Sequence, residues 1–167
     1  TPHPSSSLAP EEIQGTLDGN GLRFAIVASR FHHEITTRLA KGAVQALAEH
    51  GAKNDDIRIF WVPGCFEMPQ IALALANSGR WHAVICIGAV IKGETAHFEH
   101  VSNQAARGIE AVSRDTGVPI LFGVLTTYDK QQALDRAGGQ EGNKGYEAAL
   151  AAIEMANLLH EIRKVEA

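Results

Sequence analysis

Cysteine is scarce in this 167-residue sequence, which contains only Cys65 and Cys86. The two do not form a CxxC pair, so neither a zinc site nor a disulfide framework is predicted. Long apolar runs are missing too, because no stretch approaches the roughly 20 residues that cross a bilayer. The first ten residues, TPHPSSSLAP, lack the basic and apolar segments of a signal peptide. We therefore expect a cytoplasmic protein with no bound metal and no membrane partner.

An excess of positive charge is also missing. The sequence has 15 lysines and arginines against 19 aspartates and glutamates, which gives a formal net charge of −4. Proteins that bind nucleic acid usually present a basic patch, so we expect no nucleic-acid partner. Neither the G-x-G-x-x-G pattern nor a P-loop lysine motif occurs. The sequence therefore carries no nucleotide fingerprint, although a few well-placed donors would suffice for a small anion.

Strands and helices are predicted to alternate along most of the chain. Four apolar runs favour strands, at 23–29, 57–62, 81–87 and 118–125. Five segments favour helices, at 34–50, 69–78, 96–117, 130–137 and 144–164. Strands that alternate with helices form parallel sheets with right-handed crossovers. We therefore predict a flavodoxin-like three-layer α/β/α sandwich around a four-stranded parallel sheet.

The length suits one domain. The polar, Pro- and Ser-rich residues 1–12 are predicted to form a flexible N-terminal arm, and residues 13–167 a single domain. Within it, a short strand is predicted at 13–17, before a DGNG turn. The last helix carries apolar residues on more than one face, which favours contacts between subunits. A helix that is well buried within its own domain is the alternative.

The loops after the four predicted strands carry most of the aromatic and titratable side chains. These loops read RFHHE, PGCFE, GAVIKGETAH and TTYDK. In open α/β sheets, ligands bind outside the carboxyl ends of the strands. A parallel sheet would bring the four loops to one edge, where we expect the functional site.

The stretch GETAH has two interpretations. Gly93 lets the backbone turn, Thr95 offers a hydroxyl and an N–H group, and the free N–H groups of the following helix suit a phosphate. An ordinary helix start capped by Thr95 is the alternative. The imidazole of His97 suits proton transfer near neutral pH, but an exposed first-turn histidine is equally consistent. Lys92 and His100 are interpreted as solvated or structural.

Three further positions are candidates, each with a structural alternative. Phe31 follows the first strand and could stack on a flat heterocycle or belong to the core. Glu67 could accept hydrogen bonds from sugar-like hydroxyls, or could complement the dipole of the following helix. Arg136 precedes a Gly-Gly pair, and its forked donors suit a phosphate, although a solvated arginine at a helix end is also common.

Taken together, these segments resemble one family, the lumazine synthases of riboflavin biosynthesis. The resemblance runs in the family's order and spacing from about residue 13 to residue 159. The matching stretches are RFAIVASRFHHEIT, VPGCFEMP, GAVIKGETAHFEHV, GVPILFGVLTTYDKQQALDRAGGQEGNKG and AAIEMANL.

The resemblance implies a transferase for the penultimate step of riboflavin biosynthesis. In that step, 5-amino-6-(D-ribitylamino)uracil and 3,4-dihydroxy-2-butanone 4-phosphate condense to 6,7-dimethyl-8-ribityllumazine, with release of phosphate and water and without a cofactor. The implied catalytic residues are His97 for proton transfer and Arg136 for phosphate binding. The implied substrate-binding residues are Phe31, His32, Gly64, Cys65, Phe66, Glu67, Val90, Ile91, Glu94, Thr95, Phe122 and Lys144.

Individual roles follow from the same resemblance. Phe31 is expected to stack on the uracil ring, and 64–67 to hold the ring and the ribityl chain, with Glu67 on the hydroxyls. The backbone at 90–91 is expected to read the pyrimidine edge, and 94–95 to bind phosphate with the Glu94 side chain turned out. Three positions depart from the commonest family pattern and put pocket detail in question, but not the reaction: His32, Cys65 and Met68.

The resemblance also implies an assembly whose active sites lie between subunits. Phe122 and Lys144 are expected to come from the adjacent subunit, and the strand at 13–17 to extend a neighbour's sheet. Members form homopentamers, and the uninterrupted GGQEGNKG turn favours a sixty-subunit icosahedral shell. Association with riboflavin synthase is a further partner that this resemblance suggests.

Overall fold

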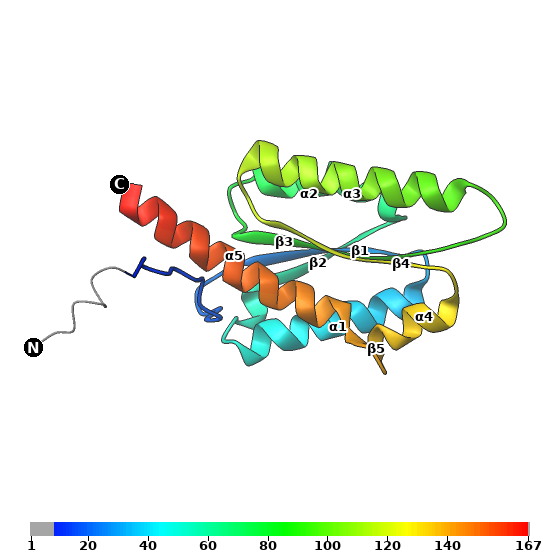
Figure 1. Ribbon diagram of the computed structural model, residues 1–167, viewed down its shortest axis with the longest axis horizontal. Helices are drawn as coiled ribbons and strands as arrows, with labels where there is room; N and C mark the ends of the chain where they lie inside the picture. The colour runs from blue at the N-terminus through cyan, green and yellow to red at the C-terminus, as the bar shows by residue number, and fades with distance from the viewer. Residues whose placement is uncertain (1–8, 167) are drawn as a thin grey trace, which may run out of the picture.

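A four-stranded, all-parallel sheet forms the centre of the protein (Figure 1). The computed structural model describes residues 9–166, with side chains as far as residue 164. The strands are β1 (Phe24–Ser29), β2 (Ile57–Val62), β3 (Ala83–Ile91) and β4 (Ile120–Thr127). They lie in the order β2-β1-β3-β4, and each neighbouring pair is parallel. The predicted flavodoxin-like sheet is confirmed.

Helices cover both faces of the sheet. Figure 1 shows α2 (Met68–Asn77) and α3 (His97–Thr116) on one face, and α1 (His33–Glu49) and α5 (Lys144–Glu166) on the other. The short α4 (Lys130–Asp135) lies beyond the end of β4. Two 3₁₀ turns, η2 (Asn54–Asp56) and η3 (Cys65–Glu67), flank β2 in the sequence. This arrangement is the predicted three-layer sandwich.

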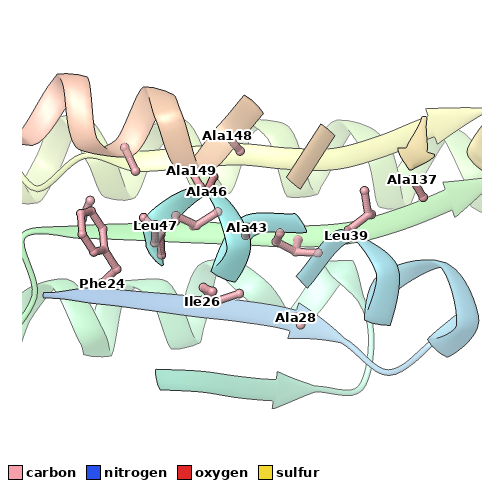
Figure 2. Packing of buried hydrophobic residues seen from close by; sticks show 14 of the residues in the cluster. Phe24, Ile26, Ala28, Leu39, Ala43, Ala46, Leu47, Ala137, Ala148 and Ala149 are labelled. Atoms are coloured by element: carbon pink, nitrogen blue, oxygen red, sulfur yellow. The ribbon is translucent and has the colours of Figure 1, made fainter. Parts of the chain in front are cut away.

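The two layers of core explain the continuous apolar strands. Side chains alternate between the faces of a strand, so a strand covered on both sides needs apolar residues at every position. In β1, Phe24, Ile26 and Ala28 pack toward α1 and α5, as Figure 2 shows for α1. Ala25 and Val27 belong to the second core, beneath α2 and α3. The resulting rigid sheet holds the loops at its carboxyl end.

The third strand extends further toward its carboxyl end than the sequence predicts. We expected it to end near residue 87, but β3 continues through Gly88 to Ile91. Pairing with β4 stabilises the extension, because the register runs on to Ile91 opposite Thr127. The fourth strand is shifted in the same direction, to Ile120–Thr127. The functional loop after β3 therefore begins at Lys92, four residues later than expected.

The glycine-rich stretch before the last helix also differs from the expected simple turn. It forms a small antiparallel hairpin of β5 (Ala137–Gly139) and β6 (Gly142–Asn143). Gly138 and Gly142 have positive φ angles of 96° and 83°, a region that favours glycine. Asn143 then anchors the hairpin, since its side-chain amide donates to the Arg38 carbonyl oxygen at 3.1 Å.

The segment at 13–17 has no strand partner within the described chain. It lies against α5, where the Asn157 side-chain amide donates to the carbonyl oxygens of Thr16 and Asp18, both at 2.9 Å. Its predicted pairing with a neighbouring subunit stays a prediction, as does the division of the chain into an arm and one domain. Most of the predicted arm, residues 1–8, lies outside the described residues.

Helix α5 keeps apolar side chains at the surface of the single chain. Met155 is 40% exposed and Ile162 is 44% exposed, whereas Ile153 is fully buried. Part of the apolar surface of α5 is therefore uncovered in the single chain, and its contact with other subunits stays a prediction. None of the helices in the described part of the chain combines the length and apolar character needed to span a bilayer.

Candidate active site

A cavity of about 830 Å³ opens at the carboxyl end of the sheet. It is lined by residues from the loops after β1 and β2 and from the end of β3 with the start of α3. Most of the predicted site residues meet there: Phe31, His32, Gly64, Cys65, Phe66, Glu67, Val90, Ile91, Thr95 and His97. Three of the four predicted loops therefore converge, because parallel strands end at the same edge.

Aromatic rings form one rim of this cavity. Phe31 is 67% exposed and Phe66 is 61% exposed, so both rings have free surface for a ligand. The backbone beneath Phe31 is fixed to the chain after β2, since its N–H donates to the Pro63 carbonyl oxygen at 3.2 Å. A flat heterocycle can stack on such rings.

The cavity floor is made by Cys65, which packs over the centre of β3. Its thiol donates a hydrogen bond to the Ser29 hydroxyl oxygen at a sulfur–oxygen distance of 3.9 Å. Burial raises the pKa of the Cys65 thiol to about 11, so the sulfur stays protonated at neutral pH. Glu67 follows at the wall, half-buried at the start of α2. The floor is thus uncharged, while the wall carries a carboxylate.

The other end of the cavity lies at the start of α3. Thr95 and His97 line it, and the Thr95 hydroxyl oxygen accepts a long hydrogen bond from the His97 backbone N–H at 3.4 Å. Ala96, not Thr95, is the residue that precedes the helix, and no side chain caps it. Apart from the long bond to Thr95, no side chain caps the start of α3, and N–H groups at a helix start can bind anions. Glu94 is exposed and does not line the cavity.

Two basic side chains that we interpreted as solvated or structural also line this end. Lys92 and His100 both contribute to the cavity wall, together with Phe98 and Val101. His100 lies three positions after His97 on α3, and residues at this spacing share a helix face. That spacing is a signal from which the position of His100 could have been predicted.

Lys92 also contacts the fourth loop. Its ammonium nitrogen lies 5.8 Å from the centre of the Tyr128 ring, and the Tyr128 and Phe98 rings are 6.5 Å apart. The loop after β4 therefore reaches the rim through Tyr128, although it does not line the cavity.

Three of the four remaining predicted residues line a second hollow of about 460 Å³, and Glu94 lines neither hollow. Phe122 on β4, Arg136 after α4 and Lys144 at the start of α5 lie there. The two hollows share no lining residue, so Arg136 and His97 are in separate places within one chain. Arg136 is exposed, with Nη1 donating to the Gln132 carbonyl oxygen at 2.9 Å. Glu141 and Glu147, which sequence reasoning missed, also line this hollow.

No group of three or more histidine, cysteine, aspartate or glutamate side chains gathers as a metal site among the described residues. The residues that line the main cavity can stack on a ring, form hydrogen bonds, bind an anion at a helix start and transfer protons through an imidazole.

The main cavity lies at the carboxyl ends of the strands of a flavodoxin-like sheet. This position is typical of α/β proteins that bind small molecules. Residues 21–160 match the sequence model of the 6,7-dimethyl-8-ribityllumazine synthase family, and the chain belongs to this family. Membership implies an enzyme of riboflavin biosynthesis that acts through the synthesis of dimethylribityllumazine.

Proposed function

We propose that this protein condenses 5-amino-6-(D-ribitylamino)uracil with 3,4-dihydroxy-2-butanone 4-phosphate. The products are 6,7-dimethyl-8-ribityllumazine, phosphate and water, which makes the protein a transferase of the penultimate riboflavin step. The observation that carries the proposal is the placing of Phe31, Glu67 and His97 around one cavity in a chain of this family.

The aminouracil is assigned to the aromatic end of the cavity. Phe31 stacks on the ring, and the carboxylate of Glu67 accepts hydrogen bonds from the ribityl hydroxyls. The end of β3 at 90–91 lies along the same cavity, where its backbone reads the edge of the pyrimidine. This arrangement leaves the amine of the ring directed toward the start of α3.

The phosphorylated ketone is assigned to the α3 end. The backbone at 94–95, the Thr95 hydroxyl and the N–H groups at the start of α3 hold its phosphate. Two reactants fixed side by side react faster, because much of the entropy cost of their meeting is met on binding. His97 then moves protons during imine formation, phosphate loss and ring closure.

Arg136 completes the phosphate site from a neighbouring subunit. In one chain it lies in the second hollow with Phe122 and Lys144, away from His97. A head-to-tail interface that closes into a ring would place the second hollow of each subunit against the cavity of the next. We accordingly propose a homopentamer, with further assembly into a sixty-subunit shell. Particle mass from light scattering distinguishes a free pentamer from a shell.

The direct test mixes the two substrates with the purified protein and follows formation of the lumazine chromophore. Phosphate release measured in the same reaction must match lumazine formation mole for mole. Omission of either substrate is the control, and neither half-reaction should yield the chromophore. A protein that binds the lumazine but never forms it from both substrates would be a carrier, and the proposed reaction would be wrong.

A further inference from the structure

His32 has a backbone conformation that is unusual for its residue type. It is the one non-glycine residue in the described part of the chain with a positive φ, at φ 59° and ψ 47°. This left-handed region is costly for residues with a Cβ atom, although histidine, asparagine and aspartate enter it more readily than most. Such strain persists where the surrounding structure imposes it, and it occurs often at functional sites.

Hydrogen bonds on both sides of His32 impose the conformation. Before it, the N–H of Arg30 donates to the Val62 carbonyl oxygen at 2.8 Å, which continues the alignment of β1 with β2. After it, the His32 carbonyl oxygen accepts from the N–H groups of Ile35 and Thr36, both at 3.0 Å, and so starts α1. The chain must therefore change from strand to helix at one residue, and a left-handed turn makes this change.

The turn places the His32 imidazole against the Phe31 ring. The ring centres are 4.4 Å apart and the planes meet at 60°, an edge-to-face contact. Both side chains line the main cavity. Because Phe31 is 67% exposed, little else covers its ring. An ordered aromatic ring binds a flat ligand more tightly than a free one, since less side-chain entropy is lost on binding.

We propose that His32 is a positioning residue that fixes the Phe31 ring in the orientation that stacks on the aminouracil. The inference rests on the proposed function and goes beyond it, because it assigns substrate contact to Phe31 and orientation of the Phe31 ring to His32. Its charge state fits this role: burial, and then the charge of Lys130, lower the pKa of His32 and favour the neutral imidazole. Lys130 is itself held at 3.2 Å from Glu34.

The test uses two substitutions that tolerate the turn and remove the imidazole. His32→Asn keeps a residue type that enters the left-handed region, and His32→Gly removes the backbone strain altogether. His33→Asn is the matched control, because His33 is the next residue, is exposed, and packs on Trp61 at 5.1 Å outside the cavity. Each variant is assayed as the assembled protein.

Ligand affinity and steady-state kinetics are measured for every variant. The dissociation constant of 6,7-dimethyl-8-ribityllumazine is obtained from its fluorescence, and KM is determined separately for the aminouracil and for the phosphorylated ketone. We expect both His32 variants to weaken lumazine binding and to raise the aminouracil KM by about fivefold, the size of an aromatic pair contact. The ketone KM should stay within twofold of the wild type, and the urea midpoint of His32→Gly should not fall below that of the wild type.

Several results would overturn the proposal. Wild-type affinity in both His32 variants would show that the imidazole does not hold the ring, and so would an equal loss in His33→Asn. If the His32 variants raise KM equally for the aminouracil and for the phosphorylated ketone, the substitutions cause a general structural defect and His32 has no positioning role. If the wild-type protein neither binds the lumazine nor forms it, the proposed function fails and this inference fails with it. If the wild-type protein is active and both His32 variants keep its lumazine affinity and its aminouracil KM, the inference is refuted while the proposed function stands.

Discussion

The sulfur of Cys65 occupies the space that a Cβ atom at Gly88 would need. The same Cβ position lies 2.9 Å from the Met68 methyl group and 3.1 Å from the Ser29 hydroxyl oxygen. Glycine in the middle of a strand is usually unfavourable, so its presence in β3 has a packing reason. The absence of a side chain at 88 lets η3 approach the sheet and form the cavity floor.

Gly88→Ala should therefore destabilise the protein and distort the cavity. We expect a loss of about 1–3 kcal/mol in the free energy of unfolding, the usual cost of overpacking a core. The urea midpoint measures the stability, and lumazine affinity measures the cavity. Cys65→Ala removes the blocking sulfur, so the double variant Gly88→Ala/Cys65→Ala should recover part of the loss. Additive effects of the two substitutions would show that the contact does not limit this position.

The two thiols should be almost inert in the folded protein. Burial raises the pKa of Cys65 to about 11 and that of Cys86 to about 12. Only the thiolate reacts with iodoacetamide, so at pH 7.5 both should react at least about 100-fold more slowly than in urea. Mass spectrometry after timed alkylation gives both rates. Rapid labelling of either cysteine in the native assembly would contradict the burial of the two thiols.

Protonation of His82 should destabilise the fold below neutral pH. The N–H of Arg23 donates to His82 Nδ1 at 2.8 Å, so this nitrogen must be unprotonated. Partial burial, followed by the charge of Arg23, lowers the pKa of His82 in the folded state. Neutral His82 therefore contributes its full stabilisation above its pKa in the unfolded chain, about 6.5. This contribution is lost as the pH falls through the lower pKa that His82 has in the folded protein.

His82→Asn provides the measurement for this effect. The amide oxygen of asparagine can accept the same hydrogen bond but does not titrate. Between pH 7.5 and pH 5.0, we expect the wild type to lose about 0.5–1 kcal/mol more stability than the variant, the value of one backbone hydrogen bond. His32, whose pKa is also lowered, contributes equally to both proteins. Parallel loss of stability in the two proteins would refute the role of His82.

The sheet could be predicted because burial on both faces leaves a plain trace in the sequence. The β1 and β3 segments are continuous apolar runs, as two-sided burial requires. The end of β3 could not be judged locally, because Gly88 resembles a strand exit until its contact with Cys65 is known. The hairpin of β5 and β6 was missed for a similar reason. Its backbone pairing leaves no apolar alternation in AGGQEGN.

The site was predictable where local sequence and topology agree. Phe31, Glu67 and His97 follow three different strands, and a parallel sheet brings them to one cavity. Glu141 carries no such signal, since its place in the second hollow depends on the hairpin. The relation between the two hollows depends on a second copy of the chain, which no local pattern describes.

Mixing two impaired variants should restore wild-type sites if each site combines the cavity of one subunit with the second hollow of another. His97→Ala removes the proton shuttle and should lower kcat about 10²–10⁴-fold. Arg136→Ala removes a phosphate donor and should chiefly raise KM for the phosphorylated ketone, because a charged hydrogen bond is lost. The two residues line different hollows in one chain, so neither substitution disturbs the other's surroundings.

In a ring of randomly mixed subunits, about a quarter of the head-to-tail interfaces would carry both intact halves. At a ketone concentration near the wild-type KM, unfolding and reassembling the variants together should therefore recover about a quarter of the wild-type rate, and the recovered sites should show the wild-type ketone KM. Separately reassembled variants, mixed only afterwards, are the control and should show no sites with the wild-type ketone KM and wild-type turnover. Sites contained within single subunits would give no recovery under either protocol, because every subunit would still lack one of the two groups.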